Sequence, residues 1–270
     1  MNAKLDPPPS PAPPPPESEA LLANQALPLG EHIVAVLGHG DPAYGTARKS
    51  RAFTAQSDYF RVQFKGFARV AGGQWQRFDG DDGTFHASLN AAWARADHPS
   101  RSVLFGPRSG VSLTDAFAGS ALDGYLFAQA IEWAKSVYPD YQVTPGALNT
   151  AALDEEERLR CNAFYAAQGF DFEWGDAAQK SAAYRKEKAG RLLGIWDGEK
   201  VAEVSGEAIL DTLAQHDAYK HELEYKLAEV EATQASLRRQ VQKERHTNQI
   251  MTGVTAFVML IGLMYAVGAF

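Results

Sequence analysis

The stretch Ile250–Phe270 contains no charged residue, and most of its side chains are apolar. About 20 apolar residues in a helix suffice to cross the hydrocarbon core of a bilayer. Arg238, Arg239, Lys243 and Arg245 come just before this stretch, and positive charge is enriched on the cytoplasmic side of membrane helices. The sequence therefore predicts a single-pass C-terminal membrane anchor in the lipid bilayer, with the N-terminal domain in the cytoplasm.

The preceding residues, 206–249, carry a heptad pattern that predicts a helical stalk. Its members alternate at spacings of three and four residues, which is typical of a coiled-coil seam and favours a homo-oligomer. A single helix packed back on the domain is the alternative. Polar residues within the seam can set register or oligomer state at a cost in stability. The seam residues are Ile209, Leu213, His216, Lys220, Leu223, Leu227, Val230, Gln234, Leu237 and Val241.

Composition limits the kinds of fold, partner and metal site that are compatible with the rest of the chain. Residues 1–29 are predicted to be a disordered tail, because eight of the 14 prolines lie between Pro7 and Pro16 and such a run favours extended polyproline II. The tail is either a spacer or a ligand for an aromatic groove on a partner. A net charge of -7 argues against nucleic acid as a partner. The single cysteine, Cys161, excludes an internal disulfide framework and a cysteine-rich zinc site, and we expect no metal.

Residues 30–205 are predicted to form one α+β domain. Alternating apolar and polar residues predict several strands, and the turns between them are rich in glycine and aspartate. Asp79–Gly83 is read as a hairpin turn in preference to a calcium loop, because it lacks the distal bidentate glutamate. His39, in a glycine-rich turn, is read as an exposed turn residue in preference to a catalytic one. The expected strands are His32–Leu37, Tyr59–Val70, Gln74–Phe78, Phe85–Leu89, Val103–Phe105, Val111–Leu113, Asp140–Thr144, Phe170–Trp174, Leu192–Trp196 and Val201–Val204.

Three helices are expected in the same domain. The first, from Leu122 to Val137, follows a loop, and such a strand–loop–helix unit brings unpaired backbone N–H groups to the positive end of a helix. The second begins after Asp154, which can cap it, and ends at Gly169, which can adopt the left-handed conformation. The third is expected between Asp176 and Gly190.

Two of these segments resemble a known family. Residues 160–172, RCNAFYAAQGFDF, resemble the last conserved block of the GNAT acyltransferase superfamily, and residues 122–135, LDGYLFAQAIEWAK, resemble the helix after its pyrophosphate loop. The resemblance covers about Tyr59 to Trp174. It implies a GNAT-like mixed sheet flanked by helices, followed here by the stalk and the transmembrane helix. It also implies a membrane-tethered acyltransferase that uses acyl-CoA, most simply acetyl-CoA, on an unknown protein or small-molecule acceptor.

The resemblance also implies a set of site residues. The pantetheine of acyl-CoA would lie along the strand near Val111 and Leu113, and Tyr165 would protonate the departing thiolate. The family's loop usually opens with Gln or Arg and carries glycines at two set positions, whereas this chain has Ala118, Ala121 and Asp123 there. The pyrophosphate would sit on Ala118, Gly119, Ser120, Ala121, Leu122, Asp123 and Gly124.

The residues leave a second function open. A carboxylate at Asp123 would repel a pyrophosphate, and a Cβ obstructs close backbone approach. No general base can be identified from the sequence. Tyr165 is either an acid or a tyrosine at the edge of the core, and Cys161 reads as a small buried apolar residue in preference to a nucleophile. The alternative to the acyltransferase is therefore a non-catalytic adaptor that recruits a partner to the cytoplasmic face of a membrane.

The first testable prediction concerns the uncharged stretch. The full chain should sediment with membranes and resist extraction by high salt or by carbonate, because about 20 apolar residues bury their surface in the bilayer. Truncation after Asn248 should release the chain into the soluble fraction. A full chain that is monodisperse without detergent would contradict the prediction.

Overall fold

The computed structural model describes residues 18–38, 42–107 and 111–266. The chain divides into two units, one up to Ser205 and one from Gly206 onward. Each unit is described by itself.

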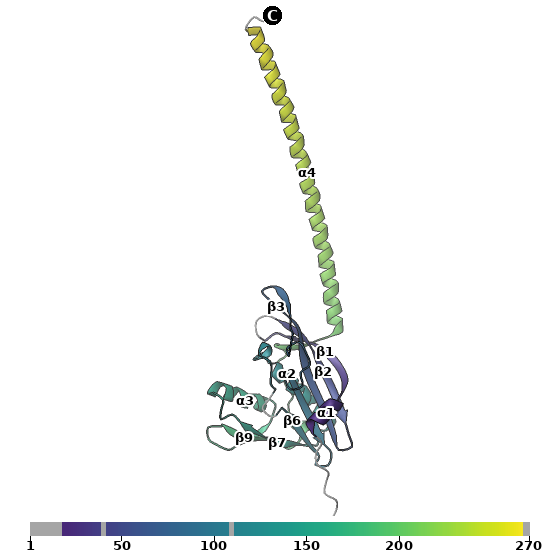
Figure 1. The fold of residues 1–270 in the computed structure, drawn as a ribbon, viewed down its shortest axis with the longest axis vertical. Coiled ribbons are helices and arrows are strands. Elements are labelled where there is room, and N and C mark those ends of the chain that lie inside the picture. Colours follow the sequence, from purple (N-terminus) through teal and green to yellow (C-terminus); the bar gives the residue numbers. More distant parts are fainter. Residues whose placement is uncertain (1–17, 39–41, 108–110, 267–270) are drawn as a thin grey trace, which may run out of the picture. The chain divides into compact units, whose positions relative to one another are not determined.

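The first unit is built on one mixed sheet of ten strands (Figure 1). The strand order is β10-β1-β2-β3-β5-β6-β7-β9-β8, and β4 pairs with the far end of β3. All neighbours are antiparallel except β6 and β7. The strands are β1 Leu27–Val36, β2 Ala43–Phe53, β3 Ser57–Ala71, β4 Gln74–Arg77, β5 Ala91–Asp97, β6 Ser102–Gly106, β7 Gln142–Asn149, β8 Asp171–Trp174, β9 Ser181–Lys186 and β10 Val201–Val204.

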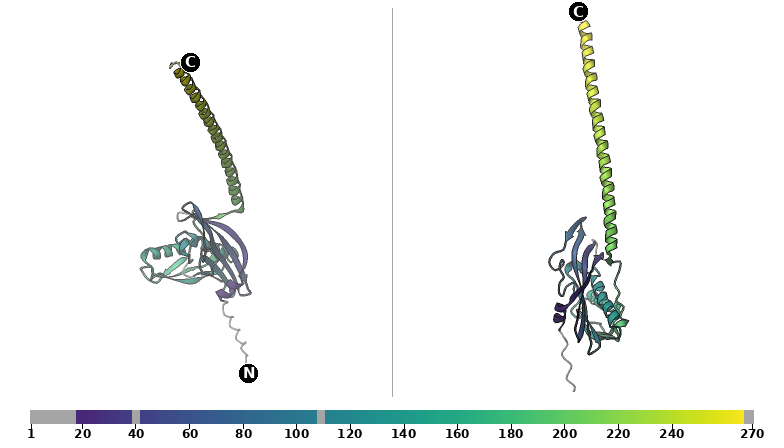
Figure 2. Two further views of the ribbon diagram at one scale, coloured as in Figure 1. Left: turned by 45° about the horizontal axis from the view of Figure 1, so that its top comes forward. Right: turned by 90° about the vertical axis from the view of Figure 1, so that its right-hand side faces the viewer.

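Helices lie on both faces of this sheet (Figure 2). On the inner face, Phe60, Val62 and Phe64 of β3 join the same core cluster as α2 (Leu122–Val137). On the outer face, Tyr59, the residue before Phe60, packs with Trp93 and with Leu22 of α1 (Glu19–Gln25). Successive side chains of a strand point to opposite faces, so α1 and α2 cover opposite sides. The other helices are α3 (Glu155–Ala167) and the short turns η1 (Asp115–Phe117) and η2 (Ala189–Arg191).

Helix α2 is the centre of the inner core. Leu122, Leu126, Ala130 and Ile131 are all fully buried, and Trp133 stacks on Phe60 with ring centroids 5.3 Å apart. At roughly 25 cal/mol per Å² of apolar area, each large side chain buried in this way contributes about 1.5–3 kcal/mol. Helix α2 is therefore stabilised by the burial of apolar side chains on more than one of its faces.

Strands β6 and β7 pair only at their first residues and then separate. Their parallel register contains Ser102 with Gln142 and Val103 with Val143. Pro145 follows within β7, and proline has no N–H to donate to a ladder. The two strands therefore diverge as a wedge.

Five aromatic rings form one buried cluster that includes Phe105 of β6 and lies against Gly146 of β7. Tyr165 of α3 stacks on Tyr184 of β9 with centroids 4.6 Å apart, and Phe105 of β6 meets Phe127 of α2 at 5.8 Å. Phe170 contacts all four of these rings. All five side chains are less than 5% exposed. We call these five residues the aromatic cluster.

A buried carboxylate ties the end of α2 to the sheet. The side chain of Asp58 is fully buried and accepts from Arg51 Nε at 2.9 Å. Tyr138, which follows α2, donates its hydroxyl to Asp58 Oδ2 at 2.7 Å. Burial, and then the bond to Asp58, raise the pKa of Tyr138. A buried charge is tolerated when it is paired and hydrogen-bonded in this way.

The second unit is one helix, α4, from Gly206 to Ala266. Its 61 residues correspond to a length of about 90 Å at 1.5 Å per residue. The helix is long and apolar enough to cross a membrane. It continues without a break from the predicted stalk into the uncharged stretch.

Several local expectations were wrong. Residues 85–89 and 111–113 form no strand, Asp176–Gly190 contains β9 instead of a helix, and Leu192–Trp196 is irregular. Strand β10, which was expected, pairs with β1. The domain also begins before residue 30, because α1 and the start of β1 lie within the predicted tail. Tertiary pairing decides these segments, and alternation within a short window cannot reveal it.

The bonds to Asp58 generate a stability prediction. Tyr138→Phe should lower the free energy of unfolding by about 1.5–3 kcal/mol, the usual loss for a hydrogen bond to a charged group. Tyr141→Phe is the matched control, since its hydroxyl meets only His98 Nδ1 at 3.2 Å, and should cost about 1 kcal/mol. Denaturant unfolding of the full chain in detergent, followed by tryptophan fluorescence, measures both. Equal losses would contradict the role given to Asp58.

Candidate functional site

The loop predicted to hold a pyrophosphate leads directly into α2. Gly119 and Ala121 both adopt positive φ angles, 73° and 65°. Ala121 is the N-cap of α2, and its side chain makes no capping hydrogen bond. The loop thus turns sharply before the helix and leaves the helix N-terminus to be capped by another group.

Asp123 places a carboxylate at this N-terminus. Its Oδ1 accepts from the backbone N–H of Gly124 at 2.9 Å. Ser120 is turned inward, where its hydroxyl donates to the carbonyl oxygen of Phe117 at 2.6 Å. Negative charge is favoured at a helix N-terminus, so the chain itself supplies the anion that this position attracts.

A cleft of about 240 Å³ lies between the start of α2 and α3. We call it the α2–α3 cleft. It contains two carboxylates and one guanidinium, with apolar walls between them. Its lining residues are Val111, Asp123, Leu153, Glu157, Arg160, Cys161 and Phe164.

The structure brings together only some of the predicted site residues. Val111 and Asp123 line the α2–α3 cleft. Leu113 packs against the main core, and Ser120 and Leu122 are buried. Ala118 and Gly119 are exposed, whereas Ala121 and Gly124 are half-buried. The predicted set is thus divided between the cleft, the core and the surface.

Tyr165 lies inside the aromatic cluster and not along the α2–α3 cleft. Its side chain is 0% exposed, and Phe127 meets its ring edge-on at 5.8 Å. Tyr184 covers its face. In this conformation the ring contributes to core packing and is not among the residues that line the cleft.

Cys161 is half-buried beside Arg160 in the α2–α3 cleft. Burial raises the pKa of the Cys161 thiol, and the nearby charge of Arg160 opposes this rise. A thiol with a raised pKa is a weak nucleophile at neutral pH. The geometry therefore gives Cys161 no activation.

Among residues 18–38, 42–107 and 111–266, no cluster of three or more His, Cys, Asp or Glu side chains could hold a metal ion. His39 lies outside the described residues.

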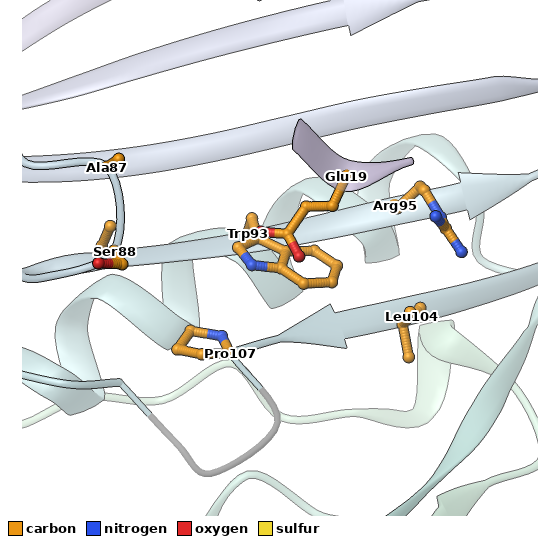
Figure 3. Close-up of a pocket in the computed structure, with 8 residues that line it drawn as sticks. Glu19, Ala87, Ser88, Trp93, Arg95, Leu104 and Pro107 are labelled. Carbon is orange, nitrogen blue, oxygen red and sulfur yellow. The ribbon is translucent and has the colours of Figure 1, made fainter. Parts of the chain in front are cut away.

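A second and larger cavity lies on the outer face of the sheet, beneath the start of α1 (Figure 3). We call it the outer pocket; its volume is about 400 Å³. Trp93 forms its floor and is 8% exposed. In Figure 3 the carboxylate of Glu19 points over the indole of Trp93, and Arg95 projects beside it. The lining residues are Glu19, Ala87, Ser88, Ala91, Trp93, Arg95, Leu104 and Pro107.

No pattern in the sequence indicates the outer pocket. Its residues come from α1, from the segment before β5, and from β5 and β6. Strand β5 was itself not predicted, and no motif links Glu19 with Trp93. The only local signal is the alternation of Trp93 and Arg95 with Ala92, Ala94 and Ala96.

Comparison with known proteins adds no assignment: no protein-family model matches the chain, and neither a curated protein nor a solved structure is significantly similar to it.

The environment of Cys161 generates a prediction about its reactivity. With a raised pKa, the folded chain holds less thiolate than the unfolded chain at the same neutral pH. The rate of alkylation by iodoacetamide should therefore reach its midpoint at a higher pH in the folded chain than in denaturant. Mass spectrometry of the alkylated peptide measures this rate. A midpoint at lower pH in the folded chain would identify an activated thiol instead.

Proposed function

We propose that this chain is a membrane-anchored binding module without acyltransferase activity. In this proposal a GNAT-like domain is carried by a helical stalk, and α4 anchors it in the bilayer with the domain in the cytoplasm. The module holds a protein or small-molecule partner at that face of the membrane. The observation that carries the proposal is the full burial of Tyr165, the expected acid, within the aromatic cluster.

The order of elements supports the GNAT-like part of the proposal. Strand β6, the loop at residues 118–124, α2, β7, α3 with Phe164 and Tyr165, and then β8 follow one another along the chain. This is the order that the resemblance implies for the family's core. The separation of β6 from β7 leaves a wedge next to the start of α2, the region where the resemblance would put acyl-CoA.

The residues in that region do not fit acyl-CoA. Ligand sites usually have volumes of about 300–1,000 Å³, and the α2–α3 cleft has about 240 Å³. Asp123 already occupies the N-terminus of α2 with a negative charge, and Glu157 adds a second carboxylate against the single guanidinium of Arg160. Tyr165, the expected acid, is buried in the aromatic cluster and does not line the cleft. We therefore derive no transfer step from this site.

The membrane part of the proposal rests on α4. The helix has the length and the apolar composition to cross a bilayer. Arg238, Arg239, Lys243 and Arg245 precede the uncharged stretch, and the positive-inside rule places such residues in the cytoplasm. The heptad pattern supports self-association of the stalk.

The outer pocket is the better candidate for partner contact. Its volume of about 400 Å³ lies within the usual range for ligand sites. An aromatic floor with both a carboxylate and a guanidinium at the rim suits a ligand that has an apolar surface and polar groups of either sign.

Acyltransferase activity remains the second candidate, because the cleft lies where the family resemblance would put the cofactor. Cys161 lines that cleft, so its alkylation rate reports whether the cleft is filled. We expect acetyl-CoA and longer acyl-CoAs at millimolar concentration to leave this rate unchanged and to give no heat in calorimetry with the full chain in detergent. Protection of Cys161 together with saturable heat would restore the acyltransferase.

Asp123→Gly sharpens the same test. It removes a repulsive charge and a Cβ at the N-terminus of α2, so any residual affinity for acyl-CoA should increase. Asp115→Gly is the matched control, because Asp115 lies in the same connection but does not line the cleft. If Asp123→Gly creates binding and Asp115→Gly does not, Asp123 is the residue that excludes the cofactor.

A further inference from the structure

Helix α4 carries one face of the stalk into the uncharged stretch without interruption. It is one uninterrupted helix from Gly206 to Ala266, so the angular spacing of side chains around its axis is the same in the stalk and in the uncharged stretch. A residue spacing that defines a seam in the stalk therefore defines the same side of the helix beyond Ile250.

The three- and four-residue spacing of the stalk seam can be extended past Val241. It reaches Glu244 and Asn248 and then enters the uncharged stretch. Within that stretch the same side of the helix presents Met251, Thr255, Val258 and Gly262.

The seam side contains small residues at membrane depth. Among the seam positions from Met251 to Gly262, Thr255 and Gly262 are small; Gly253 and Ala256 are also small but lie off the seam. In a membrane, apolar surface gives no net drive for helix association, and small residues allow backbones to approach closely enough for van der Waals packing. Thr255 and Gly262 thus allow a close approach on the side that continues the stalk seam.

We propose that the stalk and the membrane segment form one continuous parallel interface with a second copy of this chain. The inference rests on the proposed membrane anchoring. Two chains inserted in the same bilayer with the same orientation have parallel stalks, so each seam residue meets its own copy. Asn248 then faces Asn248, and an amide side chain can both donate to and accept from its copy. A polar residue of this kind fixes the register of the pair.

Charge on the flanks of the seam fits the same arrangement. In a parallel pair, a flanking residue faces the one five positions later on the other copy. Lys226 then faces Glu231 of the second copy, an attractive pair. His216, Lys220 and Glu244 face their own copies within the seam, which is unfavourable for Lys220 and Glu244. The closest packing is therefore expected from Leu223 to Val241 and again from Asn248 to Gly262.

An antiparallel pair is the competing arrangement. It would set Glu224 opposite Arg245 and Glu231 opposite Arg238, since these four residues share one flank at seven-residue intervals. However, it would place the two uncharged stretches at opposite ends of the pair. Two chains anchored in one bilayer cannot adopt it.

Cysteine cross-linking of the full chain in membranes tests the proposal. In a Cys161→Ser background, which leaves no native thiol, single cysteines replace Asn248 or Thr255 on the seam and Ile250 or Phe257 as controls. Oxidation by copper phenanthroline and oxygen should form disulfide dimers at the seam positions roughly tenfold faster, because a disulfide needs Cα atoms within about 7 Å. Equal rates, or faster rates at Ile250 and Phe257, would overturn the proposal.

Two glycines of the stretch, Gly253 and Gly262, provide a second, matched measurement. Gly262 lies on the seam and Gly253 lies off it. In energy transfer between labelled chains in vesicles, Gly262→Ile should lower the dimer fraction several-fold and Gly253→Ile should not, although both changes add the same apolar group. A chain recovered in the soluble fraction would refute the anchoring itself. A membrane-bound chain with equal effects at both glycines would refute only the shared interface.

Discussion

The fold of the first unit depends on the aromatic cluster, which joins the elements on both sides of the separation between β6 and β7. The strands pair at two positions and then separate, because Pro145 cannot continue the ladder. The rings of the cluster come from β6, α2, α3, β9 and the turn before β8, and all five are buried. Gly146 belongs to the same arrangement, since a Cβ there would come within 2.1 Å of the Tyr184 ring. The packing of this cluster thus joins both halves of the sheet to α2 and α3.

This packing supports the proposed binding module over an acyltransferase. A site for a large anionic cofactor needs an open wedge and a helix N-terminus free to receive the anion. Here Tyr165 is buried in the aromatic cluster, and Asp123 supplies a carboxylate at the N-terminus of α2. The outer pocket lies on the other face of the sheet. In the proposed binding module, the region around β6, α2 and α3 would serve as core while the outer pocket contacts a partner.

The sequence allowed much of the core to be anticipated but little of the site. The alternation of Phe60, Val62 and Phe64 and the apolar faces of α2 located the main sheet and its helix, because periodic burial is written in local sequence. Strand β5 was missed since four of its seven residues are alanines, which carry no strand signal. Tyr165 was recognised by motif, yet its burial depends on Tyr184, which lay in a segment expected to be helical.

The proposed binding module requires the aromatic cluster to stay closed in the presence of acyl-CoA. Hydrogen exchange of the full chain in nanodiscs, with and without acetyl-CoA, measures this directly. Exchange should be unchanged in the first turn of α2, in α3 and in the paired strands β7 and β9. Protection of the amides at Leu122–Tyr125, together with faster exchange in β7 and β9 as the wedge opens, would contradict it.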